Sequence, residues 1–312
     1  MVYFDLILLL VSIAVLVFSA RTIISSTSKL SRWFKLGEFA AGFLIIAVST
    51  SMPELAVAIM ASAIGAGGLV VGNVIGANLI DVLVVLGVSA LIAPVIVSQK
   101  QLIDNAEILL VISLIPLFLL LRGNLHLVEG LVLLAIFVLY ALFISKQKVS
   151  LKLGKKPRVF DIMKEEIVFG ASLFLLLVSA RFLTMSAVNI AGFMGVPESI
   201  IGLTIISIGT TLPELAVSIT AMFRRNYSLA LGNILGSSVT NLTLVLGTGA
   251  VLTALSFNYL IIGSSVLMLL IANILLTFSL IKYKSIPKKM GWIFLGAYLL
   301  FLLIELGLVP MT

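Results

Sequence analysis

The sequence predicts an all-α integral membrane protein, in which ten transmembrane helices form an inverted five-plus-five repeat with broken second and seventh helices. Its composition, the spacing of its apolar stretches and an internal duplication are the three observations behind this prediction. Of the 312 residues, 61% are hydrophobic and 11% are charged, whereas an ordinary soluble domain is about 45–50% apolar and about 25% charged. The chain has too few charges to cover a water-facing surface, which excludes a soluble enzyme.

Ten apolar stretches follow one another along the chain, separated by polar runs or by short turns. Their centres lie near residues 12, 48, 80, 112, 136, 176, 208, 242, 270 and 299. A helix that crosses a bilayer needs roughly 20 apolar residues, so ten of them use about 200 positions and leave no room for a soluble domain. The first stretch, Leu6–Ala20, follows Asp5 instead of a basic segment, so we expect a mature helix and not a secretory signal.

Basic residues predict how the helices are oriented. If ten helices alternate in direction, 17 of the 20 Lys and Arg residues fall on one side. Because basic loops stay in the cytoplasm, we expect a multi-pass protein of the cell membrane with both termini extracellular and a cytoplasmic linker at 146–164. The same rule explains the net charge of +7. The expected surroundings are therefore the lipid bilayer, with no nucleic-acid partner and no obligate protein partner.

The chain contains a duplication. Gly42–Ser89 aligns without a gap on Gly202–Gly249, and 18 of the 48 aligned positions are identical. Each copy belongs to a unit of five helices, an odd number, so the second unit enters the membrane from the opposite side. We therefore predict a first repeat at 1–145 and a second, inverted repeat at 165–312, joined by the linker 146–164.

Three acidic residues lie deep in apolar stretches: Glu54 in the second, Asp81 in the third and Glu214 in the seventh. A charge at the centre of a membrane helix costs about 2.5–3.5 kcal/mol on insertion scales, so it persists where it meets a partner, a polar cavity or an ion. No Lys or Arg is available at that depth in the sequence. Three unpaired carboxylates therefore indicate a cation site.

Glu54 and Glu214 each follow a proline, at matched places in the two repeats. Pro53 and Pro213 cannot donate a backbone hydrogen bond, so each helix should kink or break there and free carbonyl oxygens. Further oxygens near the kinks belong to Ala47, Ser49, Thr50 and Ser51, and to Ser207, Gly209, Thr210 and Thr211. An all-oxygen site with carboxylates suits Ca²⁺ or the similarly sized Na⁺, and it does not suit zinc or copper.

The third and eighth stretches carry small residues that allow close helix packing, among them Gly76 and Gly236. Five residues after each glycine comes a polar residue, Asp81 in the first repeat and Asn241 in the second. The pair is symmetric in position and asymmetric in charge. Together with the two glutamates it gives a site with up to three negative charges, enough for one Ca²⁺ and a proton, or for three Na⁺.

The two copies resemble the alpha repeats of the cation/Ca²⁺ exchanger superfamily, and within it those of prokaryotic sodium/calcium exchangers, and the resemblance covers essentially the whole chain. It implies ten helices in an inverted repeat, with ion sites among the second, third, seventh and eighth. It implies that Glu54 and Glu214 bind Ca²⁺ directly and that Thr50 and Thr210 add backbone oxygens. It also implies two flanking Na⁺ sites, one lined by Ala47 with Ser51 and the other by Ser207 with Thr211 and Ser237.

The sequence departs from this family at two positions. Family sodium exchangers of this size often carry the third carboxylate in the second repeat, whereas here it is Asp81, with Asn241 opposite. The family commonly has a Ser where this chain has Ala77, although the mate Ser237 is retained. The acid at Asp81 is also similar to the second-repeat Asp of potassium-dependent exchangers.

These features predict a secondary antiporter that exchanges Ca²⁺ for Na⁺ by alternating access, with both ions competing for shared carboxylates. Such a protein is a transporter and not an enzyme, and it needs no cofactor besides the transported ions. Proton/Ca²⁺ antiport and K⁺-dependent Na⁺/Ca²⁺ exchange remain alternatives, with H⁺ or K⁺ as further transported ions. A cation channel is an alternative from a different class, but channels usually build their acidic rings by oligomeric symmetry. An intramembrane protease is excluded because Asp81 is the single membrane Asp and the chain has 1 His.

Overall fold

The computed structural model describes residues 2–31, 46–96, 106–115, 123–145 and 159–308. Within these ranges six helices are long and apolar enough to cross a membrane, or seven if one bent pair counts as a single span. The six spans are Tyr3–Ile23, Gly67–Ile92, Leu127–Ile144, Met163–Met194, Tyr227–Leu252 and Ile262–Tyr283. The chain is therefore a helical membrane protein, and the count of ten helices stays a prediction.

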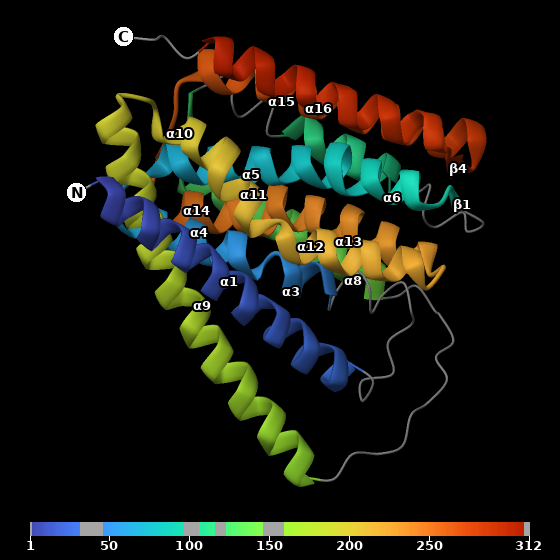
Figure 1. The fold of residues 1–312 in the computed structure, drawn as a ribbon, viewed down its shortest axis with the longest axis horizontal. Coiled ribbons are helices and arrows are strands. Elements are labelled where there is room, and N and C mark those ends of the chain that lie inside the picture. Colours follow the sequence, from blue (N-terminus) through green and yellow to red (C-terminus); the bar gives the residue numbers. More distant parts are fainter. Residues whose placement is uncertain (1, 32–45, 97–105, 116–122, 146–158, 309–312) are drawn as a thin grey trace.

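The first half of the chain contains short helices between two long ones (Figure 1). Its elements are α1 (Val2–Ser31), α3 (Val48–Thr50), α4 (Met52–Ala63), α5 (Gly67–Leu79), the π-helical η2 (Ile80–Val85), α6 (Leu86–Ile92), β1 (Val95–Ile96), β2 (Asn124–Leu125) and α8 (Leu127–Ser145). A short apolar helix also covers Ala106–Ile115.

The second half repeats this order. Its elements are α9 (Val159–Met194), α10 (Glu198–Ile201), the π-helical η3 (Gly202–Ile206), α11 (Ser207–Thr210), α12 (Leu212–Phe223), α13 (Tyr227–Thr240), the π-helical η4 (Asn241–Val245), α14 (Leu246–Leu252), β3 (Leu255–Ser256), α15 (Tyr259–Tyr283), β4 (Ser285–Ile286) and α16 (Lys288–Leu308). Because α9 begins at Val159, the last residues of the predicted linker are helical, while 146–158 lie outside the described residues.

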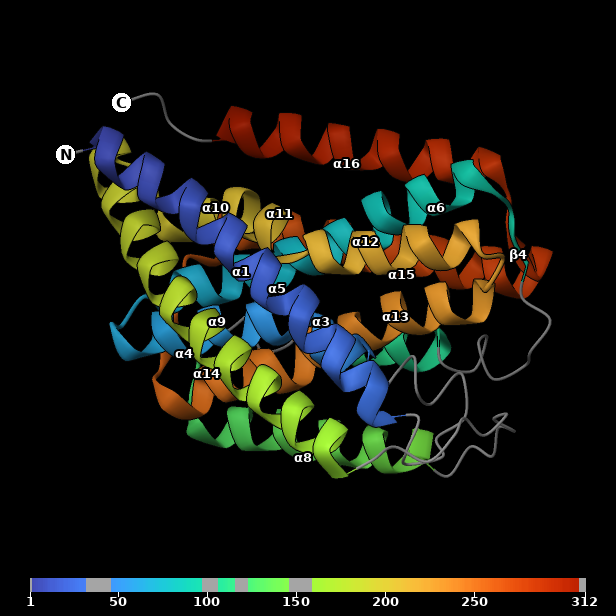
Figure 2. The same cartoon turned by 60° about the horizontal axis from the view of Figure 1, so that its bottom comes forward.

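Two continuous spans form the centre of the molecule. A stretch of 18 residues within Tyr227–Leu252 is 89% buried inside the protein, and one within Gly67–Ile92 is 78% buried, against 22% of Leu127–Ile144. The peripheral helices cover them: α16 packs on α6 and η2, and α8 packs on α14 and η4 (Figure 2). The outer faces of α8 and α16 expose large apolar side chains, including Leu139 and Leu303, as lipid-facing surfaces do.

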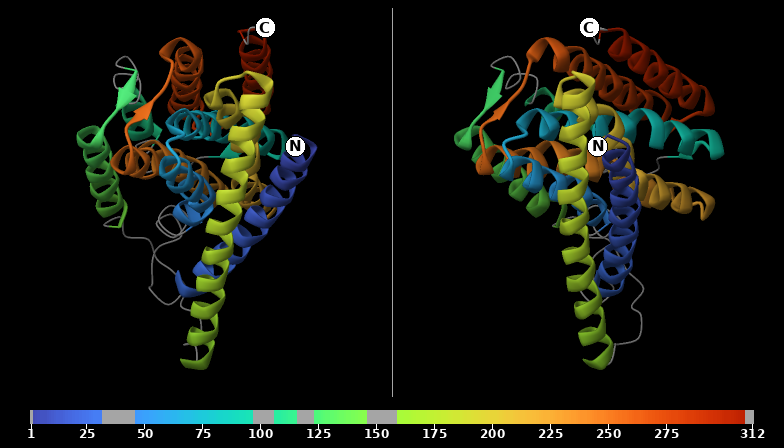
Figure 3. Two further views of the ribbon diagram at one scale, coloured as in Figure 1. Left: turned by 90° about the vertical axis from the view of Figure 1, so that its left-hand side faces the viewer. Right: turned by 60° about the vertical axis from the view of Figure 1, so that its left-hand side comes forward.

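The long helices α1 and α9 lie side by side and antiparallel, at an angle to the rest of the bundle (Figures 1 and 3). Near their ends the Asn189 side-chain amide donates a hydrogen bond to the Asp5 carboxylate, at 3.0 Å. The start of α1 and the end of α16 lie at the same end of the molecule (Figures 1 and 2). The pair of α1 and α9 contacts the rest of the protein mainly through α4, and less through α3, α10 and α11.

Two short antiparallel ribbons join the halves of the chain. β1 pairs with β4, Val95 opposite Ile286, and β2 pairs with β3, Leu125 opposite Leu255. Val95 and Leu255 are equivalent under the same shift in numbering that relates the duplicated segments. Each ribbon therefore uses one strand from each half, and the two ribbons lie at opposite ends of α15. Two-residue strands have no alternating pattern, so the sequence does not reveal them.

Glycines let helices from different repeats approach closely at the centre. A Cβ on Gly72 of α5 would lie 2.1 Å from the carbonyl oxygen of Ser199, and one on Gly76 would lie 2.3 Å from that of Leu203. A Cβ on Gly202 would in turn lie 2.5 Å from the carbonyl oxygen of Leu69. Backbone is thus packed directly on backbone, which holds α5 against α10, η3 and α11.

We expect the Gly72→Ala variant to lose stability, because the new methyl group forces two backbones apart. Overpacking of this kind costs about 1–3 kcal/mol. The measurement is the thermal unfolding midpoint of the purified protein in detergent. Gly296→Ala is the matched control, since a Cβ at this position of α16 meets nothing within 4 Å, and it should leave the midpoint unchanged or slightly higher. Equal midpoints for Gly72→Ala and wild type would contradict the packing described here.

Candidate cation site

The structure breaks one helix in each repeat at the predicted place. Ser51 separates α3 from α4, and Thr211 separates α11 from α12. Both residues have nearly the same backbone angles, φ −77° and ψ 3° for Ser51, and φ −83° and ψ 0° for Thr211. The second half-helices begin immediately before Pro53 and Pro213, and the break in the second repeat bends the helix by 42°. Proline removes the donor for the carbonyl four residues earlier.

The three predicted carboxylates come together at these breaks. Glu54 and Glu214 lie in the first turns of α4 and α12, and Asp81 is the second residue of η2. All three side chains have 0% of their surface exposed. Glu54 lies close enough to both Asp81 and Glu214 for their charges to interact, and Asp81 interacts with Glu214 as well. One buried cluster thus contains acids from both repeats.

Most oxygens of this cluster lack a hydrogen-bond partner among the described residues. Both carboxylate oxygens of Glu54, both of Glu214 and Oδ1 of Asp81 are buried and unpartnered. The Thr210 hydroxyl lies near Glu54 and the Thr50 hydroxyl near Glu214, outside good hydrogen-bonding geometry. An unpaired buried carboxylate is costly unless a cation or a proton neutralises it. The cluster therefore has the chemistry of a cation site.

Threonines and asparagines connect the two repeats around the acids. The Thr50 hydroxyl donates to Oδ1 of Asn233 at 3.2 Å, and the Thr210 hydroxyl donates to Oδ1 of Asn73, also at 3.2 Å. Each bond joins one repeat to the other. The alignment of the repeats places Thr50 on Thr210 and Asn73 on Asn233, so the two bonds are equivalent. The Asn233 amide also donates to the backbone carbonyl of Glu214 at 3.2 Å. These contacts fix the broken helices against α5 and α13.

The position of the third carboxylate breaks this symmetry. Ser237 donates to Oδ2 of Asp81 at 2.9 Å, across the repeat boundary. The equivalent partners in the other direction are Ala77 and Asn241, and an alanine cannot donate this bond. Accordingly, the side-chain nitrogen and oxygen of Asn241 are both buried without a partner among the described residues. The sequence departs from the family at two places, the acid at Asp81 with Asn241 opposite and the alanine at Ala77. Both departures therefore concern one contact and its equivalent in the other repeat.

Asp81 and Asn241 lie at the start of π-helical segments that the sequence does not predict. Asp81 belongs to η2 and Asn241 is the first residue of η4. A π-helical turn replaces the usual hydrogen bonds with longer-range ones and is frequent at functional sites. Residue types give little indication of such turns, because the surrounding packing decides where they form. Here both repeats place their π-helical turn at the same aligned position.

The backbone oxygens near the breaks are partly used inside the helices. The Ala47 carbonyl accepts from the Ser51 N–H at 3.0 Å, and it lies 3.0 Å from the Thr50 hydroxyl, whose single proton it shares with Oδ1 of Asn233. The Ser207 carbonyl accepts from the Thr211 N–H at 3.1 Å and from the Thr211 hydroxyl at 2.7 Å. By contrast, the Ser51 hydroxyl has no partner among the described residues. The hydroxyl of Ser51 is therefore freer to bind an ion in this conformation than the carbonyls of Ala47 and Ser207.

A metal ion at this site would need more than its acidic ligands. Within the described ranges no three acidic or imidazole side chains gather closely enough to hold a metal ion alone. Hydroxyl, amide and carbonyl oxygens lie around the carboxylates and could complete a shell of hard ligands, as Ca²⁺ requires. The candidates in contact with the carboxylates are the hydroxyls of Thr50, Thr210 and Ser237. The Ser51 hydroxyl and the Asn241 amide are further candidates, because they are buried without a partner among the described residues.

One further acid, Glu305, is buried away from the central cluster. Glu305 lies near the end of α16, yet its side chain is 1% exposed. Its Oε1 accepts hydrogen bonds from the hydroxyls of Ser264, at 2.6 Å, and Ser265, at 2.8 Å. Both serines are in α15, so Glu305 joins the last two helices and lies outside the central cluster.

Comparison with known proteins identifies the family. The model of the "Sodium/calcium exchanger protein" family matches residues 4–146 and 166–307. The chain belongs to this family. The two matched stretches leave out 147–165, which nearly coincides with the predicted linker 146–164.

Several proteins resemble this chain over almost its whole length. It is 29% identical to the inner membrane protein YrbG of Escherichia coli, over 97% of each chain. It is 27% identical to the sodium/calcium exchanger MaX1 of Methanosarcina acetivorans, over 97% of this chain and 99% of that one. The solved structure of the sodium–calcium exchanger NCX_Mj, soaked with Na⁺ and Sr²⁺, matches with a TM-score of 0.70 and 27% identity, over 97% and 99% of the two chains.

We expect Ser237→Ala to destabilise this family member, because it leaves Oδ2 of Asp81 without its hydrogen-bond donor. A hydrogen bond to a charged group contributes about 1.5–3 kcal/mol. Unfolding of the purified protein in detergent, followed by heat, measures the loss. Ser238→Ala is the matched control, since Ser238 is the next residue of α13, is equally buried and has an unpartnered hydroxyl among the described residues. If both variants unfold like wild type, the contact between Ser237 and Asp81 does not stabilise the site.

Proposed function

We propose that this protein is a secondary antiporter that exchanges Ca²⁺ for Na⁺ across the cell membrane by alternating access. The observation that carries the proposal is the buried cluster of Glu54, Asp81 and Glu214, whose unpartnered oxygens come from both repeats. Membership of the sodium/calcium exchanger family supports it. So does the likeness to MaX1 and NCX_Mj, both named sodium/calcium exchangers. In this proposal the chain is a transporter and not an enzyme, with Ca²⁺ and Na⁺ as cargo and no resident cofactor.

The coupling of the two fluxes follows from the shared carboxylates. Glu54 and Glu214 bind either Ca²⁺ or Na⁺, so the two ions compete for the same oxygens and do not occupy them together. Without any cation, several buried negative charges would remain uncompensated, and reorientation of the site in that state is too costly. Each crossing of the membrane therefore carries a cation, and opposite crossings carry different ones.

The remaining ligands of the proposed site follow the repeat. Asp81 supplies the third charge, and Ser237 keeps it oriented by donating at 2.9 Å. Hydroxyl, amide and backbone oxygens complete the central and flanking sites, and they belong to Ala47, Thr50, Ser51, Ser207, Thr210, Thr211, Ser237 and Asn241. Since Ala77 offers no hydroxyl beside Asn241, the flanking Na⁺ site on that side is the weaker one in this proposal.

The architecture we propose for this function is the ten-helix inverted repeat. The inverted repeat is supported because the contacts between the halves come in equivalent pairs. Each ribbon, each Thr–Asn bond and each helix break has an equivalent at the corresponding place of the other repeat. We propose repeats at 1–145 and 165–312 with a cytoplasmic linker at 146–164. Both termini would be extracellular, in line with the shared end at which α1 starts and α16 stops (Figure 2). Motion of α1 and α9 against the central helices would give alternating access.

Two other exchange modes use the same site. Carboxylates that alternate between Ca²⁺ and protons would make a proton/Ca²⁺ antiporter, and the acid at Asp81 would allow K⁺ to accompany Na⁺. The observation that favours Na⁺ is the number of hydroxyl-bearing residues beside the acids, since hard, neutral oxygens suit an alkali cation. A channel is disfavoured because all three acids come from one chain and have no exposed surface.

We expect Glu54→Gln and Glu214→Gln each to abolish Ca²⁺ uptake driven by a Na⁺ gradient, because each removes one of two shared anionic ligands. The measurement is ⁴⁵Ca²⁺ uptake into proteoliposomes. Glu305→Gln is the matched control, a buried acid in a membrane helix outside the cluster, and it should retain uptake. Substantial exchange in either Glu54→Gln or Glu214→Gln would reject the shared-ligand mechanism.

We expect a Na⁺ gradient at clamped pH, without K⁺, to drive Ca²⁺ uptake by the wild-type protein. The reason is that Na⁺ alone can displace Ca²⁺ from the shared oxygens. Parallel assays with only a proton gradient, and with Na⁺ and K⁺ together, give the comparison. Uptake driven only by protons would replace the Na⁺ mechanism with proton antiport, and uptake that requires K⁺ would make the exchange K⁺-dependent.

A further inference from the structure

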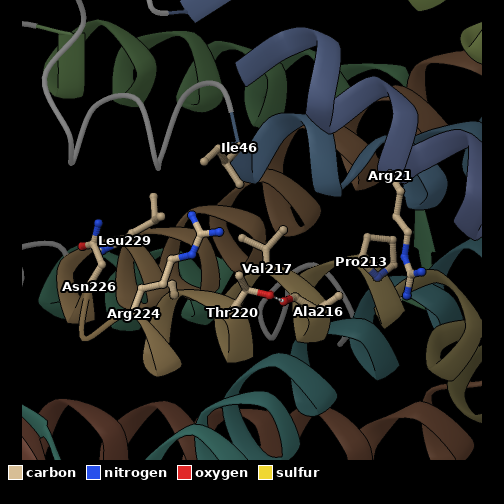
Figure 4. A pocket seen from close by; sticks show the side chains of 10 residues that line it. Arg21, Ile46, Pro213, Ala216, Val217, Thr220, Arg224, Asn226 and Leu229 are labelled. Carbon is tan, nitrogen blue, oxygen red and sulfur yellow. Dashed lines mark hydrogen bonds between the residues drawn. The ribbon is translucent and has the colours of Figure 1, made fainter. Parts of the chain in front are cut away.

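A cavity of about 640 Å³ lies between α1 and α12, at the side of the cation site (Figure 4). We call it the α1–α12 cavity. Its walls are largely apolar and include Ile46, Ala216 and Val217. It reaches Pro213, the residue before Glu214, while the Glu214 side chain itself is fully buried. The cavity therefore leads toward the cation site and ends one residue short of it.

The equivalent contact in the other repeat is closed. The alignment of the repeats places α4 on α12 and α9 on α1. α9 packs extensively on α4, whereas α1 makes few contacts with α12. Val57 and Ala56 of α4 are accordingly buried, while their equivalents in α12, Val217 and Ala216, are half-buried. The two repeats thus have the same helix pair in different conformations, as alternating access between two sides of a membrane requires.

The charges of the α1–α12 cavity have one sign. Arg21 of α1 and Arg224, which follows the last residue of α12, line it, and none of its lining residues is acidic among those the structure describes. Figure 4 shows the two arginines toward opposite ends, with the Arg21 guanidinium beside Pro213 and with Val217 between them. Arg224 belongs to the basic run that predicts the cytoplasmic side. A cation that moves from that side toward Glu214 therefore passes a positive charge at each end of the cavity.

Arg21 lies deeper in its helix than the sequence indicates. The apolar stretch Leu6–Ala20 stops just before it, but α1 continues to Ser31, so Arg21 is ten residues from the end of the helix. The sequence alone predicts no basic residue at the depth of the acids, whereas the structure places this guanidinium beside Pro213. It does not neutralise the cluster, because the charges that act on Glu214 are those of the two other acids.

We propose that the α1–α12 cavity is the route between the cytoplasm and the carboxylates in this conformation, and that Arg21 makes this route a filter for the charge of the passing ion. The proposal rests on the exchange function proposed above and names the residue that separates Ca²⁺ from Na⁺ on one side of the membrane. An arginine beside a path is an electrostatic barrier to cations. Because Coulomb energy is proportional to charge, the barrier is twice as high for Ca²⁺ as for Na⁺. Na⁺ therefore passes Arg21 faster than Ca²⁺ does.

The route is tested with single cysteines, because the chain has no cysteine of its own. Val217→Cys places a thiol in the cavity between the arginines, and Val57→Cys, at the equivalent position of α4, is the matched control. Everted membrane vesicles present the cytoplasmic side to two membrane-impermeant methanethiosulfonates, one anionic and one cationic. Both should modify Val217→Cys, the anionic one faster after correction for the rates with free cysteine, and neither should modify Val57→Cys. An unreactive Val217→Cys, or equal modification of the two variants, would overturn the route.

The charge of the filter is tested by adding Arg21→Gln to Val217→Cys. This change should lower the ratio of the anionic to the cationic reaction rate about tenfold, since one nearby positive charge acts on the two reagents in opposite directions. Arg21→Lys keeps the charge and should keep the ratio. Arg181→Gln is the matched control, because Arg181 is the equivalent arginine of α9 and is not among the lining residues that the structure describes. A ratio that Arg21→Gln leaves unchanged, or that Arg181→Gln lowers equally, would contradict the proposal.

Transport separates this inference from the function on which it rests. In the same vesicles, initial uptake of ⁴⁵Ca²⁺ and of ²²Na⁺ is measured at concentrations well below saturation. Arg21→Gln should raise the Ca²⁺ rate about tenfold and the Na⁺ rate about threefold, because the double charge squares the factor. An equal change in both rates, or no change, would overturn the filter and leave exchange intact. If wild type shows no Ca²⁺ uptake driven by Na⁺, the proposed function fails, and the filter fails with it.

Discussion

The structure depends on the cost of buried negative charge. Glu54, Asp81 and Glu214 are fully buried and close enough to repel one another, and five of their six oxygens have no hydrogen-bond partner among the described residues. A hydrophobic core could not keep such a cluster unless cations or protons compensate it. The broken helices, the π-helical turns and the close glycine contacts are the means by which the chain brings these acids together. In our proposal the same cost makes transport strictly coupled.

Duplication supplies the geometry for this cluster. One repeat alone provides a broken helix with a single glutamate, and its Thr50 hydroxyl finds its asparagine partner in the other repeat. Each of the two ribbons likewise pairs one strand of the first half with one strand of the second half. Every repeat therefore needs the other to satisfy its buried polar groups. The asymmetric pair of Asp81 with Ser237, and Asn241 with Ala77, shows where this chain has modified the symmetric plan.

Much of the site could be predicted from the sequence, because its signals are local and repeated. Pro53 and Pro213 indicate the breaks, since proline removes a donor wherever it stands in a helix. The acids are evident because charge in an apolar stretch is rare. The partners of Thr50 and Ser237, the π-helical turns and the ribbons could not be predicted, since they depend on which segments meet in space. The role of Glu305 is hidden for the same reason, because its hydrogen-bond donors are two serines of another helix, α15.

The central claim is that Ca²⁺ and Na⁺ occupy the same buried oxygens by turns. The most direct test is equilibrium binding of ⁴⁵Ca²⁺ to the purified protein during titration with NaCl, with choline chloride as the control for ionic strength. Our account predicts that Na⁺, and not choline, displaces all the bound Ca²⁺, and that displacement is steeper than for a single competing ion. Ca²⁺ that stays bound at saturating Na⁺ would show that the two ions use different sites and would contradict the account.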